Sequence, residues 1–108
     1  MDNTPGCSNV YVWGGTEKRR NAQSDVLGNL IAASMRPIMT GSRGSNKVIP
    51  CTDRVGILEG MQAPAVLLEV GFVNHLADCK KLADDATLDS LTTSIAQAVD
   101  SWVKSIRQ

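Results

Sequence analysis

The fold of this 108-residue chain is decided by one apolar run, AVLLEVGF at residues 65–72. Aliphatic and β-branched residues fill the run and a glycine closes it, which is the pattern of a buried β-strand. Glu69 interrupts this pattern. A carboxylate in apolar surroundings costs several kcal/mol if it is ionised without a partner, so it either takes up a proton or pairs with a cation. Both outcomes suit an active-site acid or base, and Glu69 is the first candidate for a functional residue.

Composition narrows the classes of protein to which this chain can belong. Hydrophobic residues make up 43% and charged residues 20%, which excludes disorder. The net charge is zero and no basic stripe is present, which argues against nucleic acid as a partner. No apolar run approaches about 18 residues, so no membrane span is expected. The first residues, MDNTPG, lack the basic start and apolar centre of a signal peptide. We therefore expect either a cytoplasmic protein or a piece of a longer one.

The three cysteines give no sign of a disulfide framework or of a zinc knuckle. Cys7, Cys51 and Cys79 are odd in number, lie far apart and form no CxxC pair. We interpret them as ordinary small apolar residues.

The first half of the chain predicts a strand, a helix and a second strand. NVYVW at residues 9–13 is a short strand ended by two glycines. The spacing of apolar residues then predicts a helix from an N-cap at Thr16 to about Met35, ended by Pro37. Residues 40–53 are rich in Gly, Ser, Asn and Pro and are expected to form a loop, with a strand following at 55–58. The apolar face of this helix should consist of Val26, Leu27, Leu30, Ile31 and Met35.

The second half predicts one strand and two helices. The strand covers residues 65–70, a loop follows at 71–75, and a short helix spans about 76–82. The last helix is capped by Asp85 or Thr87 and has a stripe of Leu88, Leu91, Ile95, Val99, Trp102 and Ile106. The expected order is β-α-β-β-α-α in a single domain. A continuous apolar strand is usually covered on both faces, so we expect an α/β fold, a partial three-layer sandwich whose central strands are flanked by helices.

Several segments together resemble one enzyme family. The run PAVLLEVGFVNH at residues 64–75 is similar to the signature of zinc-dependent N-acetylmuramoyl-L-alanine amidases of the amidase-3 type. VYV at 10–12, SRG at 42–44 and IAQAV at 95–99 also resemble segments of that family, as do an acid at Asp78 and a leucine at Leu82. NH at 74–75 departs from the usual Ser-Asn. The resemblance covers nearly all of residues 1–108 but only the C-terminal portion of the family domain, so we expect an N-terminally truncated amidase-like domain.

The resemblance implies a peptidoglycan hydrolase of bacterial or phage type. Such enzymes cleave the amide between N-acetylmuramic acid and L-alanine, with a zinc-bound water as nucleophile. By its position in the motif, Glu69 would be the general base that takes a proton from this water. The end of a strand in an α/β sheet is a usual place for such a site. A glutamate at a strand end can also simply reach solvent, or pair with Arg43 or Arg54.

The resemblance also implies that the zinc ligands are missing. The family's two histidines and glutamate lie upstream of the position of Val10, and the only histidine here is His75. We expect His75 to be a loop or helix-cap residue rather than a substrate contact or a metal ligand. The isolated chain should then be inactive alone. It would be marginally stable, or would pair with a complementary N-terminal fragment or a second copy, because losing part of a sheet exposes an edge.

Three hypotheses about the function stay open at this point. The first is an amidase acting on peptidoglycan or muropeptide outside the cytoplasm, which the family implies although no export signal is present. The second is a catalytically inactive amidase remnant that serves as a cell-wall or protein binding module. The third is a small α/β interaction domain whose match to the motif is accidental.

Overall fold

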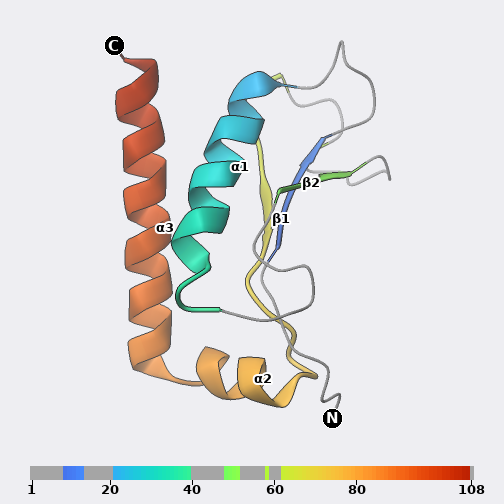
Figure 1. Cartoon of the computed structure of the whole chain (residues 1–108), viewed down its shortest axis with the longest axis vertical. Coiled ribbons are helices and arrows are strands. Elements are labelled where there is room, and N and C mark those ends of the chain that lie inside the picture. The colour runs from blue at the N-terminus through green and yellow to red at the C-terminus, as the bar shows by residue number, and fades with distance from the viewer. Residues whose placement is uncertain (1–8, 14–20, 40–47, 52–57, 59–61, 108) are drawn as a thin grey trace.

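The computed structural model of this chain describes residues 9–13, 21–39, 48–51, 58 and 62–107. Within these residues, three strands and three helices follow one another along the chain in the predicted order β-α-β-β-α-α (Figure 1). The strands are β1 (Asn9–Trp13), β2 (Val48–Cys51) and β3 (Leu67–Glu69), and the helices are α1 (Ala22–Met35), α2 (Leu76–Leu82) and α3 (Asp85–Ile106). The α/β class predicted from the sequence is confirmed.

The sheet formed by the described strands has the order β2-β1-β3. β1 pairs with β2 in parallel, so β1, α1 and β2 make a β-α-β unit. β3 lies on the other side of β1 and runs antiparallel to it, with Leu68 opposite Val10. This arrangement brings the apolar run of residues 65–72 beside the first strand of the chain.

The second strand does not lie where the sequence predicts it. β2 falls within residues 40–53, which we expected to form a loop, and it pairs Val48 with Val10 and Ile49 with Tyr11. Pro50 lacks an N–H group, but a strand at the edge of a sheet tolerates a proline. Of the strand expected at 55–58, the structure describes only Leu58, which is a buried turn residue. Val48 and Ile49 are β-branched and favour a strand, but the Gly- and Ser-rich residues before them led to the prediction of a loop.

Helix α1 begins later than predicted and ends where predicted. Its N-cap is Asn21, whose side-chain oxygen accepts from the Gln23 amide at 2.9 Å, so the expected cap at Thr16 is wrong. Asn is as good a cap as Thr because its short oxygen reaches the same free amides. The helix ends at Met35, before Pro37. Its buried face follows a spacing of four residues, with Leu27, Ile31 and Met35, whereas Val26 is 43% exposed.

Helix α1 lies close to the sheet because Gly28 has no side chain. A Cβ at Gly28 would lie 3.1 Å from Val48 Cγ2 and 3.3 Å from Val10 Cγ1. Figure 1 shows α1 between the strands and α3, and α1 contacts both. The described helices α1 and α3 therefore pack against each other, and α1 covers the face of the sheet that carries Val10.

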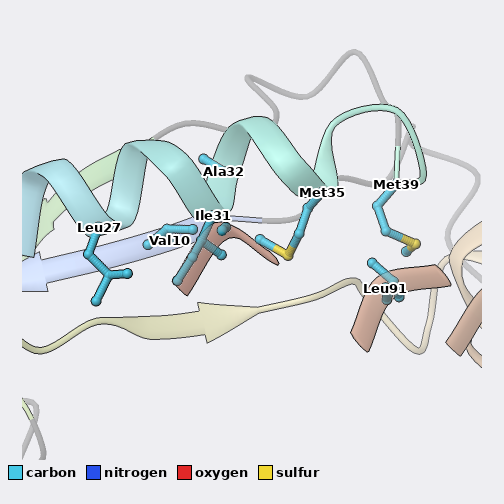
Figure 2. Close-up of a cluster of buried hydrophobic side chains, with 8 residues drawn as sticks. Val10, Leu27, Ile31, Ala32, Met35, Met39 and Leu91 are labelled. Atoms are coloured by element: carbon cyan, nitrogen blue, oxygen red, sulfur yellow. The ribbon is translucent and has the colours of Figure 1, made fainter. Parts of the chain in front are cut away.

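One hydrophobic core joins these elements. Figure 2 shows Val10 of β1 facing side chains of α1, with Leu91 of α3 near Met39. Val66, Leu68, Val70 and Trp102 are partly buried against this cluster. The fully or nearly fully buried hydrophobic side chains of the cluster are Val10, Leu27, Ile31, Ala32, Met35, Met39, Leu91 and Ala98.

Helix α2 is short and helix α3 is long, as the sequence predicts. α2 spans Leu76–Leu82. The N-cap of α3 is Asp84, not Asp85 or Thr87 as expected, and its carboxylate accepts from the Thr87 amide at 3.0 Å. Of the predicted stripe on α3, Leu91 is buried while Leu88, Val99 and Ile106 are exposed. Within the described ranges, we find no helix with the length and apolar character needed to cross a membrane.

Candidate functional site

Glu69 is the last residue of β3, and its side chain is exposed. The expectation that apolar groups enclose this carboxylate is therefore wrong. Side chains alternate between the two faces of a strand, so Leu68 packs toward the core while Glu69 points to the opposite face. Glu69 therefore reaches solvent at the end of its strand, and a pairing with Arg43 or Arg54 lies outside the described residues.

The face of the sheet that carries Glu69 has both polar and apolar groups. Asn9 of β1 stands opposite Glu69, and Tyr11 stands opposite Leu67. Residues directly opposite in an antiparallel pair share a face, with Cβ atoms about 5 Å apart. Asn9 is only 8% exposed, a buried polar side chain beside an exposed acid. The carboxylate thus lies at the polar end of a half-buried apolar surface.

A tight turn follows Glu69 and leads into α2. The His75 amide donates to the Phe72 carbonyl at 3.1 Å, which closes the turn. The Phe72 amide donates to Asp78 Oδ2 at 3.0 Å. Asp78 is 1% exposed, so a buried carboxylate of α2 holds the backbone three residues after Glu69.

His75 is the N-cap of α2, as the sequence predicts. Its Nδ1 accepts from the Asp78 amide at 3.2 Å and lies 3.3 Å from Asp78 Oδ1. His75 is thus part of the framework of the turn.

We expect Gly71→Ala to destabilise the protein by about 1–3 kcal/mol through overpacking. The added Cβ would lie 2.8 Å from Met39 Cε, 3.3 Å from Leu82 Cδ1 and 3.4 Å from Asp78 Oδ2. The Met39 methyl group ends a flexible side chain, but Met39 is completely buried, so a shift of this group would also displace its neighbours in the core. Urea denaturation followed by circular dichroism measures the loss. Asn74→Ala, at an exposed position of the same turn, is the matched control, and equal losses in both variants would contradict this account.

The described residues do not fit a zinc site. No three His, Cys, Asp or Glu side chains come close enough together among them to hold a metal ion. His75 uses Nδ1 for the cap, and the Asp78 carboxylate is bonded to Phe72.

Comparison with known proteins identifies the family. The family model of N-acetylmuramoyl-L-alanine amidase, Amidase_3, matches residues 2–101. The chain belongs to this amidase family. The match includes β1, the run of residues 65–72 and most of α3, so it covers the whole framework around Glu69. No curated protein sequence is a significant match.

Solved amidase structures share the fold. The CwlD amidase from Clostridioides difficile, solved in complex with the GerS lipoprotein, aligns with a TM-score of 0.77 at 19% identity, over 96% of this chain and 49% of that one. The catalytic domain of CwlV from Bacillus (Paenibacillus) polymyxa var. colistinus gives 0.74 at 16% identity, over 95% and 51%. AmiC2 of Nostoc punctiforme gives 0.75 at 14% identity, over 95% and 51%. This amidase-family chain therefore spans about half the length of these relatives and is a partial domain.

Two residues near Glu69 were missed as members of the candidate site. Asn9 gave no signal, because only the pairing of β1 with β3 brings it opposite Glu69. Asp78 could have been found from the sequence, because an acidic residue three positions after a helix N-cap has the spacing of a capping box. Here the acid bonds to the Phe72 amide.

Proposed function

We propose that this chain is part of an enzyme that hydrolyses peptidoglycan at the amide between N-acetylmuramic acid and L-alanine. The observation that carries the proposal is the family match over residues 2–101, which includes Glu69. The substrate class follows from the family, since the similar structures are themselves amidases. Peptidoglycan lies outside the cytoplasm, so the proposal places the working protein there.

In this proposal Glu69 is the general base. Its exposed carboxylate, at the end of a short strand, can accept a proton from a water that attacks the amide carbonyl. The same carboxyl group can then give the proton to the amine of L-alanine as the bond breaks. A general base supplies only part of the rate of amide hydrolysis, because stabilising the charge on the carbonyl oxygen usually contributes more. In the family that this chain resembles, zinc would stabilise that charge, but the described residues do not fit a zinc site.

The proposal implies that this chain works together with the rest of the domain. The chain spans about half of each similar structure, and its described sheet ends at β2 and β3. Exposed sheet edges favour pairing with further strands. The partner of the chain would be the complementary N-terminal portion, and association with a second copy is the other outcome to test.

Hydrolysis of purified peptidoglycan by the full-length protein tests the proposed function. Mass spectrometry should find released stem peptides that begin with a free L-alanine amine, together with glycan that has lost them. Products cut within the glycan or within the stem peptide would overturn the proposal. Binding of peptidoglycan without any cleavage would favour the inactive binding module.

A further inference from the structure

The carboxylate of Asp78 is the most deeply buried charged group that the structure describes near Glu69. Asp78 is 1% exposed, and burying a carboxylate is costly unless hydrogen bonds satisfy it. Its two oxygens have separate neighbours: Oδ2 accepts from the Phe72 amide at 3.0 Å, and Oδ1 lies 3.3 Å from His75 Nδ1. Both neighbours belong to the turn that follows β3, so this side chain joins α2 to that turn.

The turn has little freedom to move. The Phe72 carbonyl accepts from the His75 amide at 3.1 Å, so Phe72 is held through both its N–H and its C=O. At Gly71 even one added carbon would meet Met39, Leu82 and Asp78. Only Val70 and Gly71 separate Phe72 from Glu69. The Phe72 amide is therefore close enough along the chain for its position to restrain the end of β3 and the Glu69 side chain.

We propose that Asp78 is a positioning residue for Glu69, acting through the Phe72 amide. Hydrogen bonds to a carboxylate are stronger than those to a neutral acceptor, so this contact fixes the backbone more firmly than an ordinary turn would. The contact itself is a property of this chain. Its meaning for catalysis rests on the proposed function, because Glu69 is there the general base.

Hydrogen exchange of the Phe72 amide tests the contact in this chain. Asp78→Leu and Asp78→Asn have similar shapes, but only Asn keeps an oxygen that can accept from Phe72. We expect Phe72 exchange to become about 10- to 100-fold faster in Asp78→Leu, from loss of a bond to a charged group, and to become faster by less than about 10-fold in Asp78→Asn, which keeps a weaker, neutral acceptor. Asp84→Ala is the matched control, because it removes the cap of α3 without touching the turn. Equal acceleration in Asp84→Ala would overturn the proposal.

A second measurement needs no substitution and covers the case in which Asp78→Leu does not fold. In the wild-type chain, an NMR scalar coupling across the hydrogen bond should join the Phe72 amide nitrogen to the Asp78 carboxyl carbon, as expected for an N–H···O contact of 3.0 Å. Absence of this coupling, in a spectrum that resolves the couplings across the backbone hydrogen bonds of α3, would overturn the contact.

Kinetics of the full-length protein then separate positioning from general stability. We expect Asp78→Leu to lower kcat by about 100-fold with KM nearly unchanged, since a misplaced catalytic group affects the chemical step. Asp78→Asn should recover most of kcat, and Asp84→Ala should leave it intact. Normal kcat in Asp78→Leu with a freed Phe72 amide would overturn the positioning role. If the wild-type protein hydrolyses no peptidoglycan, the proposed function fails. The hydrogen-exchange rates still show in that case whether the Phe72 amide is bonded to Asp78.

Discussion

If the proposed function holds, we expect Glu69→Gln to lower kcat for peptidoglycan hydrolysis by the full-length protein by at least about 100-fold, the usual contribution of a general base. Gln has the size of Glu but cannot accept the proton of the attacking water. Because the side chain is exposed, the free energy of unfolding should change by no more than about 0.5 kcal/mol. The loss would thus be chemical, and rates of peptide release from purified peptidoglycan measure it.

A second exposed carboxylate provides the control for this prediction. Asp89→Asn removes a carboxylate of α3 and should keep the wild-type rate. A Glu69→Gln variant with wild-type activity would exclude Glu69 as the base, even if the protein is an amidase.

Ile31→Ala should unfold the protein or destabilise it by about 2–5 kcal/mol. Ile31 is 2% exposed and lies at the centre of the cluster in Figure 2, where α1 faces Val10 of β1. Removing three carbons leaves a cavity that the surrounding helix and strand cannot close. The free energy of unfolding of a domain is typically only about 5–15 kcal/mol, so a loss of this size can remove most of the stability. Urea denaturation gives the change in free energy.

Val26→Ala on the same helix is the control for Ile31→Ala. Val26 is 43% exposed, so truncating it should cost less than about 1 kcal/mol. Ile31→Val should fall between the two, at about 0.5–1.5 kcal/mol, because it removes a single methyl group. If Val26→Ala were as damaging as Ile31→Ala, the assignment of the buried face of α1 would be wrong.

The sequence alone predicts the features that depend on near neighbours. α2 and its cap at His75 follow from a short apolar repeat beside a side chain that can accept a backbone hydrogen bond. The end of α1 follows from Pro37, and the choice of Glu69 as the candidate base follows from the resemblance of residues 64–75 to the amidase signature. The N-caps predicted for α1 and α3 were wrong, because several nearby Asn, Asp and Thr residues can cap a helix equally well and tertiary packing determines which of them does.

The tertiary structure decided what depends on contacts between distant segments. Val48 and Ile49 form β2 because they pair with Val10 and Tyr11 of β1, a contact that their Gly- and Ser-rich neighbourhood does not reveal. Glu69 is exposed because β3 pairs with β1 in the register that turns Leu68, and not Glu69, toward α1. Asp78 meets the Phe72 amide only once the chain has turned back on itself. Composition and spacing act within a few residues, whereas strand register and burial are set by which surfaces meet when the chain folds.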